Sequence, residues 1–246
     1  MTYHFLIRGR NCEKYLKECV DSINAQVGDF EKNIHVFLDD PQDDSAEICG
    51  KLKKDSKIHK LKISSQHLGL CANMDNALGD MNMTLEPNDV ICIVDADDYL
   101  HPKALKYVNR EYTKPNTLVT HGSYIKLSKG RRTRISKPYK SWEDIRKVPW
   151  RASHLKTLKV KLLRPLGISP AFNTNIFMHE GLYLNAASDL ALMMPLCELA
   201  GWDRVAFIKK EIYYWRDNTP FKTNGSAQKR CEKIIRAKPK LERWCE

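Results

Sequence analysis

Three aspartates, Asp95, Asp97 and Asp98, stand within four positions directly after the apolar run "VICIV". Carboxylates this close raise one another's pKa unless a cation lies beside them. In an extended chain, residues two apart share a side, so Asp95 and Asp97 can face one ligand. Carboxylate oxygens are the ligands that Mg²⁺ and Mn²⁺ prefer, and such ions are commonly shared with a diphosphate. We expect Asp97 to bind a metal and Asp98 to cap the next helix; a solvated cluster of turn and cap residues is the alternative.

Two further carboxylate sites follow apolar or small residues. Asp39 and Asp40, in "VFLDDPQDDSAE", either form a turn or accept a hydrogen bond from a ligand donor, such as the ring N–H of a pyrimidine base. Asp189 begins "DLALMM", where a carboxylate stabilises the start of a helix. A cap position also holds a carboxylate firmly at the edge of a cleft, which is compatible with a general base. The local sequence leaves both choices open.

The elements that must position these residues alternate between strand and helix patterns in the first half of the chain. This order predicts an α/β fold with a doubly wound, mainly parallel sheet and helices on both faces. Ligands bind such sheets at the carboxyl ends of the strands, so the polar groups that follow the strands are expected to converge on one cleft. The predicted strands are 3–9, 33–39, 58–64 and 89–95, and the predicted helices are 12–26, 43–54, 70–81 and 102–113.

The second half is less regular. Its patterns predict strands within 116–128 and 204–216, helices over 151–167 and 188–201, and a basic amphipathic helix from about residue 222. The basic stretch 126–140 reads as a loop. The sequence contains no repeat or linker, so residues 1–246 are predicted to form one domain.

The net charge of +11 suits nucleic acid, an anionic membrane surface or phosphorylated ligands. Only Tyr139 and Trp142 accompany the basic stretch 126–140, whereas a nucleic-acid module interleaves more aromatic residues, so we expect no nucleic-acid partner. No apolar run approaches the roughly 20 residues that span a bilayer, and the first apolar run is too short for a signal peptide. A cytoplasmic protein is predicted, with peripheral membrane contact through the basic tail as an option.

The eight cysteines and eight histidines form no recognisable metal motif. No C-x-x-C pair and no H-x-x-x-H pair occurs in the sequence, so a zinc site and a disulfide framework are both disfavoured. Buried or free thiols are expected instead. His154 is a candidate for phosphate contact, although an ordinary structural histidine is the favoured interpretation.

Seven segments occur in a fixed order between residue 3 and about residue 220. They are "RGRNCEKYLKECVDSINAQ", "VFLDDPQDDSAEI", "HLGLCANMDNAL", "VDADDYLHP", "SHLKTLKVKLL", "ASDLALMMPLCELAG" and "IYYWRDNTP". Each is loose by itself, but in this order they resemble family 2 of the inverting nucleotide-sugar glycosyltransferases, which have the GT-A fold.

The resemblance implies a Rossmann-like GT-A sheet with the acceptor-side region in the second half. Residues 1–113 would bind the nucleotide-sugar, residues 114–220 would bind the acceptor and carry catalysis, and 221–246 would be a basic helical tail. The implied reaction is metal-dependent, inverting transfer of a sugar from a nucleotide-sugar, with UDP as the expected carrier, to a hydroxyl of a glycan or glycoconjugate acceptor. A non-processive enzyme is expected, because neither a Q-x-x-R-W segment nor membrane helices are found in the sequence.

The resemblance also implies residue roles. Asp189 would be the general base, and Asp97 would bind Mn²⁺ or Mg²⁺ on the diphosphate. Candidates for contact with phosphate or acceptor, beyond these implied roles, are His154, Arg131 and Arg132. The implied donor-binding residues are Arg8, Asp39, Asp40, Gly69, Asn73 and Asp95.

Several positions depart from the family pattern. Pro41-Gln42 replaces Gly-Ser, Met74 stands where an arginine is frequent, and Ser188 replaces a glutamate. Arg134 and Lys137, with the two arginines before them, are candidates to compensate for the missing arginine. These departures leave an alternative function, namely a non-catalytic module of the same fold that binds a nucleotide-sugar or a glycan. A nucleotidyltransferase would need a glycine-rich phosphate loop, and "RGRNCEKY" is not one.

Overall fold

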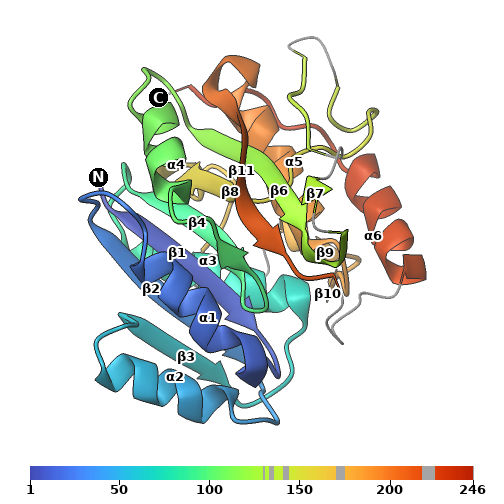
Figure 1. Cartoon of the computed structure of the whole chain (residues 1–246). Helices are drawn as coiled ribbons and strands as arrows, with labels where there is room; N and C mark the ends of the chain where they lie inside the picture. The colour runs from blue at the N-terminus through green and yellow to red at the C-terminus, as the bar shows by residue number, and fades with distance from the viewer. Residues whose placement is uncertain (130, 133–135, 141–143, 170–174, 218–224, 246) are drawn as a thin grey trace.

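The first half of the chain alternates strands and helices, as its apolar pattern predicts. The computed structural model describes residues 1–129, 131–132, 136–140, 144–169, 175–217 and 225–245 (Figure 1). The predicted boundaries agree with the observed ones to within a few residues. The elements are β1 (Tyr3–Gly9), α1 (Glu13–Asn24), β2 (Lys32–Asp39), α2 (Ser45–Lys54), β3 (Lys60–Ser64), α3 (Leu70–Thr84), β4 (Val90–Asp95), β5 (Tyr99–Leu100) and α4 (Ala104–Tyr112).

The second half adds shorter strands and two longer helices. Its strands are β6 (Val119–Lys126), β7 (Arg131–Arg132), β8 (Lys156–Lys159), β9 (Met178–His179), β10 (Leu182–Tyr183) and β11 (Val205–Trp215). Its helices are α5 (Ser188–Ala200), α6 (Gly225–Ala237) and the 3₁₀ helices η1 (Leu127–Lys129), η2 (Val160–Leu162), η3 (Asn175–Phe177) and η4 (Trp202–Arg204). Part of the predicted basic loop and the start of the predicted tail helix lie outside the described residues.

Nine of the described strands form one large sheet in the order β3-β2-β1-β4-β8-β6-β11-β5, with β7 beside β6. β9 and β10 pair in a separate two-stranded sheet. The pairs β2–β3, β1–β2, β1–β4 and β6–β11 are parallel. β8 runs antiparallel to both of its neighbours, β4 and β6. Strands β1 to β4, β6 and β11 therefore point the same way, and the predicted mainly parallel sheet is confirmed.

Helices cover both faces of this sheet, as predicted (Figure 1). Successive side chains of a strand point to opposite faces of the sheet, so each buried strand contributes side chains to two hydrophobic cores. In β1, Phe5 and Ile7 belong to the core that includes α1, α2 and α4. Leu6, between them, belongs to the core that includes α3, α5 and residues of α6.

Residues 151–167 do not form the predicted helix. They contain the strand β8 and the 3₁₀ helix η2. Leu155, Leu158 and Leu162 recur at helical spacing, but all three are fully buried, and β8 is enclosed between two strands. Pairing within the sheet has overridden the local pattern. Because β8 is antiparallel to β4, its first residues lie at the carboxyl end of β4.

The eight cysteines are all free thiols, as expected from their spacing. Seven are buried, and Cys245 is exposed. Burial raises the pKa of the Cys12 thiol to about 11 and of the Cys49 and Cys71 thiols to about 12. Among the described residues, no helix has the length and apolar character needed to cross a bilayer.

Candidate active site

The candidate site begins with the acidic turn, residues 95–98, at the carboxyl end of β4. The turn is fixed to the end of β1, because the Ala96 N–H donates to the Arg8 carbonyl over 3.1 Å. Gly9 makes this approach possible: a Cβ at Gly9 would lie 2.6 Å from the Cβ of Ala96. Ala96 therefore packs on β1. Its small side chain lets the backbone of the turn approach the backbone of β1 closely.

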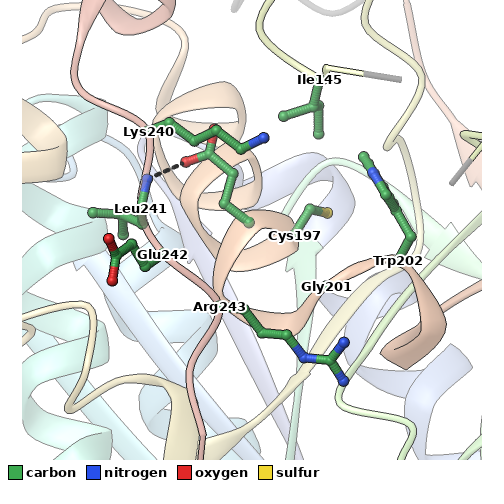
Figure 2. Close-up of a pocket in the computed structure, with 9 residues that line it drawn as sticks. Ile145, Cys197, Gly201, Trp202, Lys240, Leu241, Glu242 and Arg243 are labelled. Carbon is green, nitrogen blue, oxygen red and sulfur yellow. Dashed lines mark hydrogen bonds between the residues drawn. The ribbon is translucent and has the colours of Figure 1, made fainter. Parts of the chain in front are cut away.

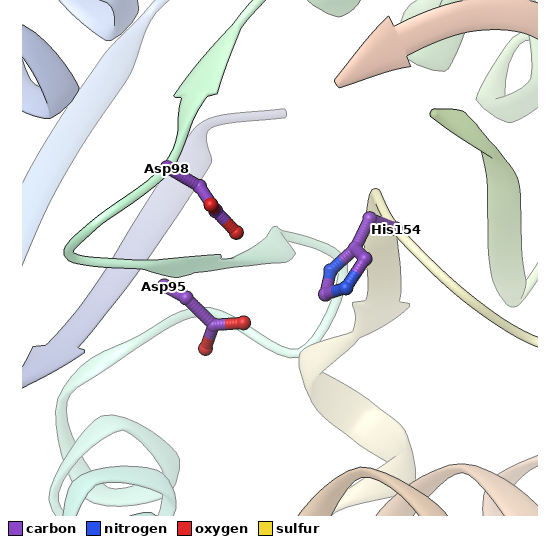
Figure 3. A group of neighbouring side chains, drawn as sticks. All are labelled: Asp95, Asp98 and His154. Atoms are coloured by element: carbon purple, nitrogen blue, oxygen red, sulfur yellow. The ribbon is translucent and has the colours of Figure 1, made fainter. Parts of the chain in front are cut away.

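Three side chains converge beside the acidic turn. Asp95, Asp98 and His154 each offer a ligand atom, and these atoms lie within 4.8 Å of one another (Figure 3). Asp95 ends β4, Asp98 follows in the turn, and His154 precedes β8. The antiparallel course of β8 is what brings His154 to this edge, since Lys156 is paired with Ile93 in β4.

Asp98 is a buried member of this group and not the predicted helix cap. The residue before α4 is Lys103, whereas Asp98 is fully buried. The Tyr213 hydroxyl donates to Asp98 Oδ2 over 2.7 Å, and the Arg216 N–H donates to its Oδ1 over 2.7 Å. Burial, together with the charges of Asp95 and Asp97, raises the pKa of Asp98 well above its usual range. A cation bound beside Asp98 would therefore favour the ionised form of this carboxyl group.

His154 is fixed by aromatic contacts. Its ring stacks on Tyr213 at a centroid distance of 4.5 Å and meets Tyr124 edge-on at 5.3 Å. The Tyr213 hydroxyl also accepts the Asp95 N–H over 3.1 Å, so Tyr213 contacts all three members of the group. Burial, assisted by the ammonium of Lys156, lowers the pKa of His154 to about 4. A neutral imidazole is the form that can bind a metal ion.

The second feature of the site is a buried ion pair. Lys156, in β8, is 1% exposed, and its Nζ lies 2.5 Å from Asp189 Oδ2 and 3.2 Å from His154 Nδ1. Asp189 lies in the first turn of α5, and its side chain is 31% exposed. Burial opposes ionisation of this carboxyl, but the charge and hydrogen bond of Lys156, with smaller effects of His154 and Arg8, lower its pKa to about 2. Lys156 therefore connects Asp189 to the acidic turn through His154.

Apart from Asp95, which ends β4, the predicted donor-binding residues lie in β1, at the end of β2 and at the start of α3. Arg8 is buried, with NH1 donating to the Leu70 carbonyl at 3.1 Å and NH2 lying 3.7 Å from Asp95 Oδ1. Asn73 is buried in α3, four residues after Gly69. Gly69 precedes α3 with φ of +84°, a conformation that favours glycine.

Asp39 and Asp40 already have partners within the protein. The N–H groups of Leu68 and Gly69 donate to the two oxygens of Asp39 over 2.7 and 3.0 Å. His67 Nδ1 lies 2.9 Å from Asp39 Oδ2. Asp40 has φ of +46° and accepts from Gln42 Nε2 over 2.9 Å. Asp39 thus has a structural use, which is to hold the turn that leads into α3.

Other predicted residues are not part of this convergence. Asp97 is absent from the group of three, and its carbonyl accepts from Arg216 NH1 over 2.6 Å. Arg131 and Arg132 form β7, but their side chains are not described, and Arg134 lies outside the described residues.

Sequence reasoning missed Lys156, Tyr213 and Arg216 as site residues. Lys156 carried a usable signal, since it stands two residues after a candidate histidine. Tyr213 and Arg216 lie in "IYYWRDNTP", one of the seven ordered segments, and that was the signal available for them. Nothing in that segment indicated that they contact the acidic turn, which is more than 100 residues earlier in the chain.

The chemistry of the group of three fits a divalent ion. Two carboxyl groups supply oxygen ligands suited to Mg²⁺ or Mn²⁺, and an imidazole nitrogen favours the transition-metal ion of the two. The Tyr213 hydroxyl contacts the carboxyl of Asp98 and orients it, as partners of metal ligands commonly do.

A separate pocket lies at the opposite end of α5. It has a volume of about 410 Å³ and contains none of the residues described above (Figure 2). The main-chain N–H of Leu241 donates to Glu198 Oε2 over 3.0 Å at its rim. Its lining residues are Ile145, Cys197, Glu198, Gly201, Trp202, Lys240, Leu241, Glu242 and Arg243.

Comparison with known proteins identifies relatives of this chain. A family model described as glycosyl transferase family 2 matches residues 7–179. The chondroitin synthase of Pasteurella multocida (strain Pm70) is 31% identical over 109 residues, which cover 44% of this chain and 10% of that protein. The chain therefore matches about a tenth of the length of that relative.

Two solved structures share the fold. S. aureus TarS 1-349 in complex with UDP-GlcNAc superposes with a TM-score of 0.67 and 21% identity, covering 89% of this chain and 59% of that one. Glucosyl-3-phosphoglycerate synthase from Mycobacterium tuberculosis, in complex with Mn²⁺, UDP and glucosyl-3-phosphoglycerate, superposes with a TM-score of 0.62 and 14% identity, covering 96% and 79%. Identities this low show the fold, and the predicted GT-A architecture is confirmed.

Proposed function

The chain belongs to glycosyl transferase family 2, and we propose on this basis that it transfers a sugar from a nucleotide-sugar to a hydroxyl group of a glycan acceptor. UDP is the expected nucleotide, because the similar structures of TarS and of glucosyl-3-phosphoglycerate synthase contain UDP-GlcNAc or UDP. The observation that carries the proposal is the approach of Asp189 to the acidic turn through Lys156 and His154. A candidate base and a candidate metal site, which could bind the donor diphosphate through its ion, then lie at one edge of the sheet.

The proposed chemistry is a single displacement. The acceptor hydroxyl gives its proton to Asp189 as its oxygen forms a bond to the anomeric carbon. The bond from that carbon to the diphosphate oxygen breaks, its electrons leave with the diphosphate, and the anomeric centre inverts. The transition state has oxocarbenium character. A carboxyl with a pKa of about 2 is a weak base, so its position beside the acceptor matters more than its basicity.

Mn²⁺ or Mg²⁺ is proposed to be held at the acidic turn, where it would neutralise charge on the leaving diphosphate. Asp97 is the ligand implied by the sequence resemblance. The convergence of Asp95, Asp98 and His154 supports these three as further ligands.

A second candidate is a nucleotide-sugar-binding or glycan-binding module without turnover. Two observations favour it. Met74 stands where the family frequently has an arginine, and it is uncharged and fully buried in the core. It therefore supplies no charged contact to a phosphate group. Both oxygens of Asp39 accept hydrogen bonds from the protein itself, which weakens its case as a base-binding residue.

The experiment that tests the proposal has two steps. A panel of nucleotide-sugars is first screened for thermal stabilisation of the protein with and without Mn²⁺. Each stabilising donor is then incubated with glycan acceptors, and release of the nucleotide is followed. We expect metal-dependent stabilisation and nucleotide release that increases with acceptor. Binding without release, for every donor and acceptor, would favour the non-catalytic module.

A further inference from the structure

Arg216 joins three parts of the molecule at the acidic turn. It directly follows β11, and its side chain is 13% exposed. NH1 donates to the Asp97 carbonyl over 2.6 Å, and NH2 is paired with Glu18 in α1. The Arg216 N–H donates to Asp98 Oδ1 over 2.7 Å. One residue therefore contacts two members of the turn and the helix beside it.

Two tyrosine rings contact the guanidinium group of Arg216. Its Cζ lies 4.9 Å from the ring centroid of Tyr99 and 5.1 Å from that of Tyr15 in α1. Stacking of this kind suits the planar guanidinium and restricts its orientation. The side chain is therefore held by two aromatic contacts as well as by its hydrogen bonds.

These contacts act on the backbone of the turn as well as on its charge. The guanidinium of Arg216 donates to the Asp97 carbonyl, and its main-chain N–H donates to the Asp98 carboxyl, so rotation of the turn would break both bonds. A substitution of the Arg216 side chain removes only the first of these bonds. Such rotation would separate Asp95 from Asp98, whose ligand atoms converge with that of His154. On the other side, the turn is fixed to β1 by the bond from Ala96 to Arg8. Arg216 supplies an opposing attachment, together with the bonds of Tyr213 to Asp95 and Asp98.

We propose that Arg216 is a positioning residue that holds the acidic turn against α1 and so keeps Asp95 and Asp98 directed at one ligand. The inference rests on the proposed function, because the turn matters to catalysis only if it receives the donor diphosphate. Arg216 is not a catalytic residue, since its charged group is turned toward α1 and the tyrosine rings.

The test uses Arg216→Met and Arg216→Lys in the full chain. Hydrogen–deuterium exchange is measured for residues 95–100, and the dissociation constant for Mn²⁺ with UDP is measured by calorimetry. Arg216→Met is expected to speed exchange of the turn and to weaken Mn²⁺–UDP binding by about tenfold or more. Arg216→Lys keeps the positive charge but loses the planar guanidinium with its paired N–H donors, so an intermediate effect is expected. The matched control is Arg243→Met, because Arg243 pairs with Asp203 at 2.7 Å beside the remote pocket.

The outcomes separate the two proposals. Unchanged exchange at residues 95–100 in Arg216→Met, or faster exchange with a wild-type dissociation constant, would overturn the role of Arg216. An equal effect in Arg243→Met would do the same, because it would show a general loss of stability. Failure of the wild-type protein to bind any nucleotide with Mn²⁺ would contradict the proposed function instead, and the exchange data would then decide whether Arg216 holds the turn.

Discussion

Asp189 faces the site as one half of an ion pair. Its partner Lys156 is almost fully buried, so the pair is held by packing as well as by charge. A carboxylate fixed in this way cannot swing freely toward solvent. This geometry suits a base that must meet one acceptor hydroxyl in one orientation.

Asp189→Asn is therefore expected to lower kcat by about 100-fold or more while leaving the affinity for UDP near that of the wild type. The amide keeps the shape of the side chain but cannot take the acceptor proton. Steady-state kinetics and calorimetry with UDP measure the two quantities. Asp203→Asn is the control, because Asp203 is exposed and pairs with Arg243. Near-normal turnover in Asp189→Asn would remove Asp189 as the base.

The acidic turn offers a sharper test of metal ligands. If the convergence of Asp95, Asp98 and His154 is the metal site, Asp98→Asn weakens Mn²⁺ binding more than Asp97→Asn does. If the sequence resemblance is the better guide, the order is reversed. Mn²⁺ titration followed by electron paramagnetic resonance distinguishes the two, with circular dichroism to check the fold of each variant.

At the residue scale, the sequence indicated which polar groups lie at the carboxyl edge of the sheet better than it indicated their partners. Asp95 and Asp189 stand out because they directly follow or begin apolar elements. Asp98 was misassigned as a cap, because its partners Tyr213 and Arg216 are distant in sequence and form a polar contact that no local pattern signals.

At the scale of elements, the regular first half was predictable because parallel strands buried on both faces are strongly apolar. β8 was not, since its leucines also fit a helix, and the sheet on either side of it decides its conformation. That one strand carries Lys156 and follows His154. The main error in the fold prediction thus fell on the segment that connects the two halves of the site.

A different group of contacts links the amino-terminal ends of β1 and β2. His4 Nδ1 lies 3.0 Å from His35 Nε2, and His4 Nε2 lies 3.2 Å from Asp89 Oδ2. Burial lowers the pKa of His35 to about 4, helped by the neighbouring His4, Lys60 and His59, whereas Asp80 acts in the opposite direction.

Stability should consequently fall in mild acid. The folded protein keeps His35 neutral, whereas in the unfolded chain it takes up a proton near its ordinary pKa of 6.5. The contribution of His35 is therefore fully present above pH 6.5 and is lost as the pH decreases toward 4. The loss is on the order of 3 kcal/mol in the free energy of unfolding.

Denaturant titrations between pH 4.5 and 7.5 measure this slope. His35→Gln should flatten it, because glutamine does not titrate. His179→Gln should leave it unchanged, because His179 is about half exposed. An unaltered slope in His35→Gln would assign the acid sensitivity to other buried groups, such as His121.

At the scale of the whole molecule, residues 238–244, here called the clamp, hold the carboxyl-terminal end of α5. The candidate base Asp189 lies at the other end of this helix. The Leu241 N–H donates to Glu198 and the Trp244 N–H donates to the Leu199 carbonyl, each over 3.0 Å. Arg204 NH2 donates to the Trp244 carbonyl over 2.6 Å. α5 is thus held at both ends by segments remote in sequence.

Removal of the residues after Ala237 is expected to lower Tm by roughly 5–10 °C, since a loss of 1 kcal/mol shifts Tm by about 2–4 °C in a chain of this size. Differential scanning calorimetry measures the shift. Removal of Cys245 and Glu246 alone leaves the clamp intact and serves as the control. Equal Tm values for the two truncations would show that the clamp contributes no stability.

The distribution of thiols has a practical consequence. Seven cysteines are buried, and Cys245 is exposed next to the clamp. A nitroxide reagent applied to the native protein should therefore attach at a single position, without any engineered cysteine. Pulsed dipolar spectroscopy between that label and a bound Mn²⁺ ion would give the distance from the end of the clamp to the metal, and so locate the ion in solution.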